Sequence, residues 1–547
     1  MIRRRSSFRF NQRLVVVLLA LTALVDGRHL QAIEADVVLV GGTLVDGTGE
    51  VGVSGDIAIR GDRIVAVGKL DNTQAARTIE CTGLIVSPGF IDLHNHSDFE
   101  SSKKDPQTGE EQKQPKILEE QLRPSSCYLT QGCTTIVTGN CGGGAVEVDD
   151  FYNQLDANRP GVNVAHLLPA GALRNKVIGM SRRGPTPEEL DTMRTLAGAA
   201  MQAGAWGMST GLQYVPGSFA ETDELVAIAE VVGRADGIYA SHMRDEGDQL
   251  LDAVEETIEI GRRANLPVHI SHFKASKQRN WGKVRAAAKA IEVARAAGRQ
   301  VTADQYPYIA SSTTITAMLL PDEEREGGKQ AVLERLSDPK QLQRLRPIVQ
   351  DSLDARGKIM IASCPQHPAW TGKTIREVAV AEQRAPVEVA LDVIRSGDEQ
   401  GVNFAMDERD VRFIMTLPWA ATASDGSTKV DDNSKPHPRS FGTFPRRIGR
   451  YAIEQGVVAV ERAIRSATGL PADIIGFSDR GYLRQGYVAD IVVFDPQSFR
   501  DQATFQSPFE VSTGVRWLLV NGQVVIDDGE LIATAAGRPL RKVVKDR

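Results

Sequence analysis

The middle of the chain alternates between short apolar segments and longer stretches rich in Ala, Glu and Arg. The apolar segments have the length and β-branched content of buried strands, and helical patterns separate them. They are residues 90–96, 134–141, 163–170, 205–210, 237–243, 267–273, 300–306 and 421–425. Eight strand–helix units predict an α/β fold, a (β/α)8 barrel of the TIM type. The alternative is an open doubly wound sheet, but the glycine-rich phosphate loop typical of its first strand is missing from the sequence.

Both ends of the chain have a different texture from the middle. Residues 36–88 and the C-terminal region contain β-branched runs broken by Gly and by Asp-Gly or Asn-Gly turns. We predict a small β-sandwich domain built from residues 33–88 and 481–547, with the barrel over residues 89–480. Residues 313–418, approximately, are charged and partly helical, and they predict a subdomain inserted between barrel strands 7 and 8 that can cover the site.

The first thirty-two residues form a separate segment. Five arginines precede an apolar run from Leu14 to Val25, which is short for a membrane span. The pattern predicts a signal peptide over residues 1–32 and export to the periplasm or the extracellular space; an uncleaved membrane anchor is the alternative. No second apolar run reaches spanning length, so we expect no stable membrane span in the mature protein.

Charge and cysteine content exclude two classes of protein. The chain has 64 Lys and Arg against 70 Asp and Glu, a net charge of -6, without the basic footprint of a nucleic-acid-binding protein. Its five cysteines are an odd number in a chain of 547 residues, which does not fit a disulfide scaffold. At least one cysteine is therefore free or bound to another group. The expected binding partner of the protein is a small-molecule substrate.

Polar residues with metal-binding chemistry stand at the ends of the predicted strands. They are His94, His96, Cys141, His242, His272 and Asp425. Active sites of this barrel lie at the C-terminal ends of the strands, so these side chains are expected to converge. Imidazole, thiolate and carboxylate together suit zinc or a similar metal.

Other histidines and cysteines are given structural roles. His166 lies inside a predicted strand, and His269 is spaced to face away from His272. His29, His367 and His437 lie outside the strand ends, and His437, in KPHPRSFGTFPR, is the one candidate among them. Cys127, Cys133 and Cys364 lack such partners and are assigned to packing.

Longer motifs carry a family resemblance. PGFIDLHNHSD (88–98) resembles the HxH motif of the amidohydrolase superfamily. From about residue 36 to the C-terminus, the chain is similar to the N-acyl-D-amino-acid deacylase (D-aminoacylase) family. The motifs are GNCG (139–142), AWGMSTGLQY (205–214), YASHMRDE (239–246), ISHFKAS (270–276), DQYPYIASST (304–313), ASDG (423–426), HPRSFGTFPR (437–446) and RGYLRQGYVADIVVFDP (480–496).

The resemblance implies roles for individual residues. Cys141 takes the place of the carboxylated lysine that bridges the metals in many relatives. Cys141, His242 and His272 would form one tight Zn²⁺ site, and His94 and His96 with Cys141 a second, weaker one. Asp425 would transfer the proton from water to the departing amine. Lys274, Tyr306 and Ser312 are implied contacts of the substrate carboxylate. Lys274 follows His272 by two and is expected to face the same side, and Arg244, two residues after His242, is a further candidate.

The expected reaction is zinc-dependent hydrolysis of N-acyl-D-amino acids to a carboxylate and a free D-amino acid. Two places depart from the family pattern: a Gly-His pair is missing in residues 169–174, and Asp322 replaces an aromatic residue after Leu320-Pro321. Both put the substrate in doubt, because both are expected near the acyl group or the side chain.

Rival functions remain open at this point. One is an exported dipeptidase for D-residue peptides. Another is a cyclic amide hydrolase of dihydroorotase or hydantoinase type, although strand four ends in Ser209-Thr210 without the usual lysine. A non-catalytic barrel is disfavoured, because such proteins typically lose ligands. The oligomeric state does not follow from the sequence.

Overall fold

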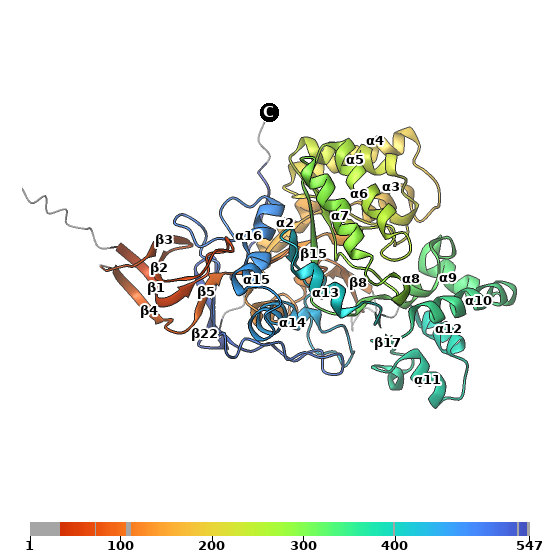
Figure 1. Cartoon of the computed structure of the whole chain (residues 1–547). Coiled ribbons are helices and arrows are strands. Elements are labelled where there is room, and N and C mark those ends of the chain that lie inside the picture. Colours follow the sequence, from red (N-terminus) through yellow and green to blue (C-terminus); the bar gives the residue numbers. More distant parts are fainter. Residues whose placement is uncertain (1–32, 72, 105–110, 398–399, 533–534, 544–547) are drawn as a thin grey trace, which may run out of the picture.

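The computed structural model describes residues 33–71, 73–104, 111–397, 400–532 and 535–543 (Figure 1). The predicted signal peptide, residues 1–32, lies outside the described residues. No helix of the described residues is both long and apolar enough to cross a membrane.

One nine-stranded sheet contains strands from both ends of the chain. Its strands are β1 (Ile33–Leu44), β2 (Val53–Arg60), β3 (Arg63–Gly68), β4 (Thr73–Glu80), β5 (Ile85–Pro88), β20 (Ile491–Phe494), β21 (Val515–Val520), β22 (Gln523–Asp527) and β23 (Glu530–Leu531). The antiparallel pair β5–β20 joins the two halves, with Val86 opposite Val493. Ile57, Ile491 and Leu519 pack in one buried cluster on this sheet, so neither end forms it alone.

All eight predicted strands of the middle region are present, as parallel strands. They are β6 (Phe90–Asp92), β9 (Cys133–Thr138), β10 (Asn163–His166) continued by β11 (Leu168–Pro169), β12 (Gly207–Gly211), β13 (Ile238–His242), β14 (Val268–Ile270), β15 (Val301–Gln305) and β19 (Ala420–Thr422). They pair in the orders β6-β9-β10 and β11-β12-β13-β14-β15-β19. Just past the strand ends, Asn95 and Gly426 form a parallel bridge between the first and last strands.

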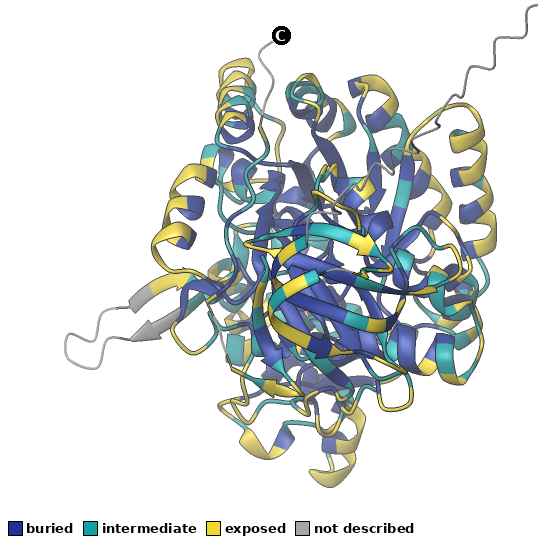
Figure 2. Ribbon diagram, turned by 90° about the vertical axis from the view of Figure 1, so that its left-hand side faces the viewer, coloured by how far each residue is buried: buried dark blue, intermediate teal, exposed yellow. Residues whose placement is uncertain are grey.

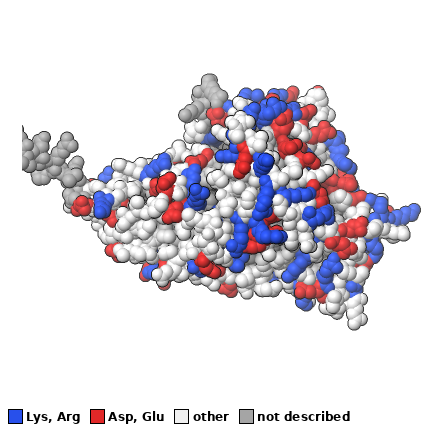
Figure 3. Space-filling model, in the orientation of Figure 1, with Lys and Arg blue, Asp and Glu red and all other residues white. Residues whose placement is uncertain are grey.

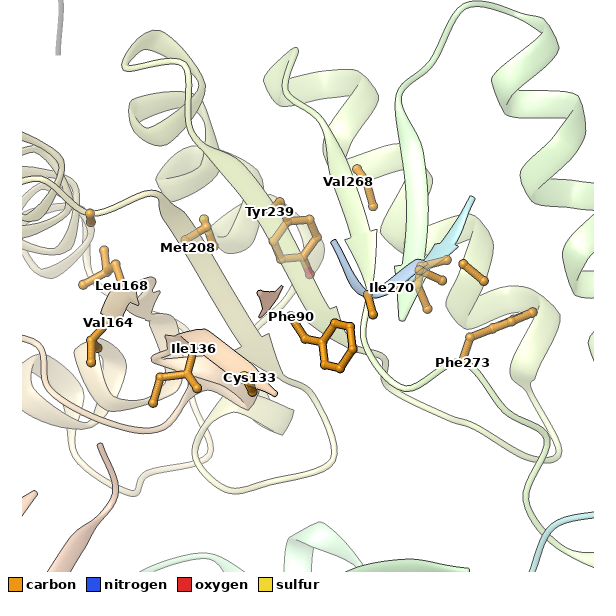
Figure 4. Packing of buried hydrophobic residues seen from close by; sticks show 14 of the residues in the cluster. Phe90, Cys133, Ile136, Val164, Leu168, Met208, Tyr239, Val268, Ile270 and Phe273 are labelled. Carbon is orange, nitrogen blue, oxygen red and sulfur yellow. The ribbon is translucent and has the colours of Figure 1, made fainter. Parts of the chain in front are cut away.

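Helices cover the outer side of these strands, and their buried faces point inward (Figure 2). They are α2 (Val148–Ala157), α3 (Ala170–Ile178), α4 (Pro187–Gln202), α5 (Thr222–Arg234), α6 (Leu250–Ala264) and α7 (Val284–Ala296). Neighbouring residues of a strand belong to different clusters. Ile136 and Tyr239 are part of the large core, which also contains Phe90 and residues of the helices (Figure 4). Val137 and Ala240 pack in a second cluster with Leu93 and Ala421. This alternation explains the continuous apolar runs, because both faces of each strand are buried.

The segment between β15 and β19 forms a largely helical lobe (Figure 1). Its elements are β16 (Ser311–Thr314), α8 (Ile315–Leu319), α9 (Gly328–Ser337), α10 (Pro339–Arg356), β17 (Ile359–Ile361), α11 (Ile375–Ala381), α12 (Pro386–Gly397), β18 (Gln400–Asn403) and α13 (Glu408–Met415). It has a hydrophobic cluster of its own, which includes Leu345, Trp370 and Leu391. The strands β16, β18 and β17 pair in that order. Residues of β16 and β18 line the same cavity as Cys141, which follows β9.

The remaining elements connect these parts. They are the hairpin β7 (Glu100–Lys104) and β8 (Glu111–Pro115), the short α1 (Ser126–Leu129), and α14 (Arg439–Pro445), the π-helix η7 (Arg446–Glu454), α15 (Val460–Ala467) and α16 (Gly469–Ile475) after β19. On the face shown in Figure 3, acidic and basic side chains are interspersed over the helical part, and much of the surface at the end formed by β1–β4 is uncharged.

Candidate active site

The candidate metal residues lie in turns that follow the parallel strands. His242 is the last residue of β13, whereas His94, His96, His272 and Asp425 come after their strands have ended. The predicted strands that carry these residues were therefore too long at their carboxyl ends. The physical reason is a reversal of the backbone: Cys141 has φ 52°, His272 φ 37° and Asp425 φ 52°. A positive φ is uncommon for residues other than glycine, and such strained residues concentrate at functional sites.

The turn that carries Cys141 is held from several sides. Cys141 is in the 3-10 turn η2 (Asn140–Gly142) directly after β9. The Asn140 side chain donates hydrogen bonds to the carbonyls of Leu93 (3.1 Å) and Val137 (2.9 Å). A Cβ atom at Gly211 would collide with the carbonyl of Cys141, so glycine is needed there for β12 to lie this close. The thiol is thus fixed above the strands rather than left on a mobile loop.

Four side chains bring a sulfur and three imidazole nitrogens together. The Cys141 Sγ lies 3.2 Å from His94 Nε2, 3.5 Å from His242 Nδ1 and 3.7 Å from His272 Nε2. A tetrahedral zinc ion with ordinary bond lengths separates a sulfur and a nitrogen ligand by about 3.6 Å. The sulfur–nitrogen distances at Cys141 are therefore close to those of ligands on one zinc ion. Among the described residues, the groups whose ligand atoms all lie within 4.8 Å of one another include His94, Cys141 and His272, and His242, Glu246 and His272.

Two further observations agree with a metal at this place. His96 Nδ1 is buried and has no hydrogen-bond partner in the described structure. His94, His96 and Asp425 place one ligand atom each within 4.8 Å of one another, which forms a second possible ligand group next to the first. The donor set therefore fits one ion at Cys141 and leaves room for another.

The electrostatics of the thiols separate Cys141 from the other cysteines. Burial alone would raise the pKa of the Cys141 thiol, but His94 and His242 beside it hold that pKa well below its usual range. Burial raises the pKa of Cys127 to about 11 and that of Cys81 to about 12. All five thiols are free and buried, yet Cys141 is the one whose surroundings favour the thiolate that a metal needs.

Asp425 lies between the imidazoles and a buried arginine. Its Oδ1 is 2.9 Å from His96 Nε2 and 3.5 Å from His94 Nε2. Arg439 donates to the other oxygen, Oδ2, at 2.6 Å. Burial would raise the pKa of the Asp425 carboxyl, but Arg439 and His94 hold it well below its usual range. Asp425 is therefore kept as a carboxylate with one oxygen directed at the metal-binding groups.

Asp304, in β15, forms hydrogen bonds with three histidines of the site region. Its carboxylate accepts from His94 Nδ1 at 3.2 Å, from His269 Nε2 at 2.9 Å and from the backbone N–H of His272 at 2.7 Å. A carboxylate on the outer nitrogen of a metal-binding imidazole fixes its tautomer and leaves the other nitrogen free as a ligand. His269 thus has a structural role, as predicted, although it contributes to the support of the site.

Glu246 links His272 to Lys274. Its Oε1 lies 2.8 Å from His272 Nδ1 and 2.5 Å from Lys274 Nζ. Burial would raise the pKa of Glu246, but Lys274 and His272 hold it far below its usual range. The predicted placement of Lys274 on the same side as His272 agrees with the 2.8 Å between Nζ and His272 Nδ1.

The substrate candidates line one cavity of about 690 Å³ that also contains Cys141 and Asp425. Lys274, Tyr306 and Ser312 are on its wall. The Tyr306 hydroxyl is buried and has no partner among the described residues. Arg439, on the same wall, lies with its guanidinium 4.9 Å from the centre of the Tyr306 ring. A cation and free hydroxyl groups at the metal site are suited to a carboxylate.

Arg244 is not brought to this cavity. Its guanidinium pairs with Glu256 and donates to the carbonyls of Ser218 and Ala220 at 2.9 Å each. It lines a separate cavity of about 460 Å³ together with Asp322. Asp322, one of the two departures from the family pattern, therefore does not lie on the wall of the main cavity, whereas Gly171 and Ala172 of the other departure do.

The remaining histidines have other partners. His166 lies 2.8 Å from Thr138 Oγ1 and from the carbonyl of Ala145, a structural role as predicted. His437 lines the main cavity and donates to the Ala310 carbonyl at 2.9 Å, while its Nδ1 accepts from the backbone of Arg439. His367 stacks on Trp370 in the inserted lobe. His29 lies outside the described residues.

Three residues of the site were missed by sequence reasoning. Asp304 stands in a predicted strand in the same way as the histidines, and that signal was available. Arg439 follows His437 by two in the recognised motif HPRSFGTFPR. Glu246 is the last residue of the recognised motif YASHMRDE and was given no role.

Comparison with known proteins places this geometry in a family. The model of the Amidohydrolase family matches residues 147–526. The chain is 35% identical to D-aminoacylase of Alcaligenes xylosoxydans xylosoxydans over 530 residues, which are 93% of this chain and 98% of the relative. The chain is also similar to a solved structure of D-aminoacylase from a study of the functional role of its binuclear metal centre. The TM-score is 0.78 at 32% identity, over 93% of this chain and 100% of that chain.

A further relative was solved in complex with zinc and an inhibitor. N-acyl-D-glutamate deacylase from Bordetella bronchiseptica, in complex with zinc and a phosphonate inhibitor that mimics the tetrahedral intermediate, also has a TM-score of 0.78, at 32% identity over 93% of this chain and 100% of that chain. These matches run through both the sheet of the chain ends and the strands that carry the site. The chain therefore belongs to the D-aminoacylase (N-acyl-D-amino-acid deacylase) family of amidohydrolases.

Proposed function

We propose that this chain is a zinc-dependent hydrolase of linear amides that converts N-acyl-D-amino acids to a carboxylate and a free D-amino acid. One observation carries the proposal. A single cavity contains the cluster of Cys141 and histidines, the ionised Asp425, and the wall of Lys274, Tyr306 and Ser312 that suits a carboxylate. The activities named for the relatives, D-aminoacylase and N-acyl-D-glutamate deacylase, support the same reaction.

Cys141, His242 and His272 would hold the tight zinc ion, and His94 and His96, with Cys141, a second and weaker one. Bound zinc supplies a water of pKa about 7 and polarises the amide carbonyl. Asp304 and Glu246 would keep the ligand nitrogens of His94 and His272 in place through the hydrogen bonds on the opposite side of each ring.

Asp425 would move the proton. Its Oδ1, near His94 and His96, accepts the proton of the attacking water and then delivers it to the amide nitrogen as the C–N bond breaks. Arg439 holds Oδ2 and so keeps the carboxylate ionised and oriented before the reaction. Without that ion pair, the pKa of this deeply buried carboxyl would be higher, and Asp425 would be less readily available as a base.

The substrate α-carboxylate would bind between Lys274, Tyr306, Ser312 and Arg439. Lys274 forms an ion pair with Glu246, and Arg439 forms an ion pair with Asp425, so each cation is already partly neutralised. The free Tyr306 hydroxyl then supplies a donor whose hydrogen-bonding capacity is unused. An unsatisfied buried donor costs free energy until a ligand accepts from it, so this hydroxyl favours an acceptor at that place.

We infer that the eight parallel strands close into a barrel. The Asn95–Gly426 bridge, the hydrogen bond from His96 N to the Gly426 carbonyl (2.8 Å) and the cluster that unites Val137, Ala240 and Ala421 support closure. The sheet of both chain ends would form the β-sandwich domain, residues 33–88 and 481–547. The lobe inserted at about 313–418 would cover the cavity. An experimental structure with β6 and β19 apart would contradict closure.

Export is proposed on the sequence of residues 1–32 alone. Cleavage by a signal peptidase would leave a mature N-terminus near Ile33. Mass spectrometry of the protein recovered from the periplasm or medium tests this, and an intact Met1 on the exported chain would contradict cleavage.

A substrate panel on the protein from Ile33 onward tests the reaction class. We expect release of amine from N-acetyl-D-amino acids, loss of that activity after a chelator removes the metal, and recovery with Zn²⁺. Cyclic amides, which lack the free α-carboxylate, should be turned over at least about 10²-fold more slowly, because a site built to bind a particular polar group rejects compounds that lack it. Dipeptides with a C-terminal D-residue keep that carboxylate but have a charged amino group on the acyl side, and we expect them to be hydrolysed more slowly than the N-acetyl compounds. Faster hydrolysis of either rival class would overturn the proposal.

A further inference from the structure

The main cavity contains a histidine outside the metal-binding groups. His437 lines this cavity and is buried. Its Nε2 donates to the Ala310 carbonyl at 2.9 Å, and its Nδ1 accepts from the backbone N–H of Arg439 at 3.1 Å. A carbonyl can only accept and a backbone N–H can only donate, so the proton of the neutral ring lies on Nε2. Both ring nitrogens are thus engaged, and neither is left to bind a metal ion or a substrate.

Two prolines restrict the backbone around His437. Pro436 and Pro438 flank it in the sequence KPHPRS, and a proline fixes its own φ and restricts the residue before it. Pro438 has φ -69° and precedes α14, whose first residue is Arg439. The first N–H groups of a helix have no partner within the helix, and His437 supplies one for Arg439. The side chain of His437 therefore helps to fix the place at which α14 begins.

The bond to Ala310 ties this helix start to the cavity wall. Ala310 directly precedes β16, whose Ser312 lines the cavity. The Nη2 of Arg439 donates to the Ser312 carbonyl at 3.4 Å, so Arg439 and His437 both contact the same segment of the wall. The other terminal nitrogen of Arg439, Nη1, donates to Asp425 at 2.6 Å. The backbone of Arg439 is therefore held by His437, and its guanidinium lies between the wall and Asp425.

Aromatic rings surround the imidazole of His437. Tyr306, Tyr308 and Phe505 lie edge-on to it, with ring centroids 5.9, 4.9 and 5.1 Å away. Burial and the charge of Arg439 hold the pKa of His437 well below its usual range. The ring is therefore neutral, and a neutral imidazole has the one donor and the one acceptor that its two backbone partners require.

We propose that His437 is a positioning residue for the reaction: its hydrogen bond to the Arg439 backbone holds that residue where the guanidinium reaches the Asp425 carboxylate. His437 would act on the rate through Arg439 and not by contact with the reacting atoms. A misplacement of about 1 Å in a group that positions the reaction can lower a rate by about 10²-fold. The inference rests on the proposed function, in which Asp425 moves the proton, and it adds a residue to that machinery.

Three variants separate the two hydrogen bonds of His437. In His437→Asn, the side-chain oxygen takes the place of Nδ1 and still accepts from the N–H two residues on, as in an Asx turn. In His437→Gln, the side-chain nitrogen takes the place of Nε2 and still donates to the Ala310 carbonyl. His437→Phe keeps an aromatic ring for packing and loses both bonds.

The rates of the zinc-loaded variants on an N-acetyl-D-amino acid are then ranked. We expect kcat/KM to fall by about 10- to 100-fold in His437→Phe and His437→Gln, with zinc per chain unchanged, and His437→Asn to recover most of the rate. A rate in His437→Asn no higher than that in His437→Gln would overturn the inference, and so would normal turnover in His437→Phe. If His437→Phe does not fold, the ranking of the other two variants decides.

A double-mutant cycle distinguishes action through Arg439 from a general loss of structure. In an Arg439→Met background, His437→Gln should cause little further loss, because the guanidinium that His437 positions is absent. His166→Gln is the matched control: His166 is also buried with both ring nitrogens engaged, but it does not line the cavity. Any loss that this control causes should be equal in both backgrounds.

The outcomes of the cycle separate this inference from the proposed function. An equal fold loss from His437→Gln with and without Arg439 would mean that His437 has only a structural role, and it would overturn the inference. If Arg439→Met is too slow to measure, the ranking of His437→Asn and His437→Gln decides. A wild-type enzyme that hydrolyses no N-acetyl-D-amino acid would count against the proposed function, whereas an active wild type with the wrong ranking would count against His437 alone.

Discussion

Replacing Cys141 by alanine should remove both the tightly bound zinc and the activity. The proposed tight site then retains only the imidazoles of His242 and His272, and the thiolate that neutralises part of the metal charge is lost. Because the metal contributes several kcal/mol to the transition state, kcat/KM should fall by at least about 10³-fold. Zinc per chain, measured by elemental analysis, and the rate of amine release check both effects on one sample.

Cys127→Ala is the control for this variant. Cys127 is also a buried, free cysteine, but it belongs to the hydrophobic core, so the variant should keep its zinc and most of its rate. The backbone of Cys141 already has a positive φ, and alanine at that position has no more strain than cysteine. A Cys141→Ala protein that keeps stoichiometric zinc and normal turnover would contradict the assignment of the sulfur as a ligand.

Asp425→Asn should keep the tight zinc ion and lose most of the rate. Asparagine has the shape of aspartate and can still accept from Arg439, but it cannot take a proton from water. General acid–base catalysis typically contributes about 10²- to 10⁴-fold, and kcat should fall by that amount. Measurement of kcat and KM on an N-acetyl-D-amino acid separates this loss from a defect in binding.

Asp432→Asn serves as the comparison for Asp425. Asp432 lines the same cavity, but its carboxylate is engaged by the backbone N–H of Ser434 at 3.0 Å, away from the imidazoles. Removal of this charge should change kcat only slightly. If Asp425→Asn turned over substrate at a near-normal rate, another group would have to transfer the proton.

The strands and the metal residues could be predicted because both leave strong local signals. Each parallel strand is buried on both faces and is therefore an apolar, β-branched run, and all eight were located. Histidine and cysteine at the ends of such runs are rare enough to mark the site. The exact strand ends could not be predicted, because the reversals at Cys141, His272 and Asp425 place non-glycine residues at positive φ.

The supporting residues were missed because their partners are distant along the chain. Asp304 is 210 residues away from His94, and no local pattern joins them. The choice of Arg244 failed for a related reason: spacing placed it near His242, but its guanidinium turns to Glu256 on α6. Spacing along a strand predicts the side on which a residue emerges, whereas the contacts of a long, flexible side chain depend on the helices packed around it.

The most direct test of the central claim is hydrolysis of a racemate. The zinc-loaded enzyme is given N-acetyl-DL-methionine until the reaction stops, and the products are separated on a chiral column. The account predicts that about half of the substrate is consumed, that all released methionine is the D enantiomer, and that N-acetyl-L-methionine remains. Release of both enantiomers, or of the L enantiomer, would contradict the assignment of this site to N-acyl-D-amino acids.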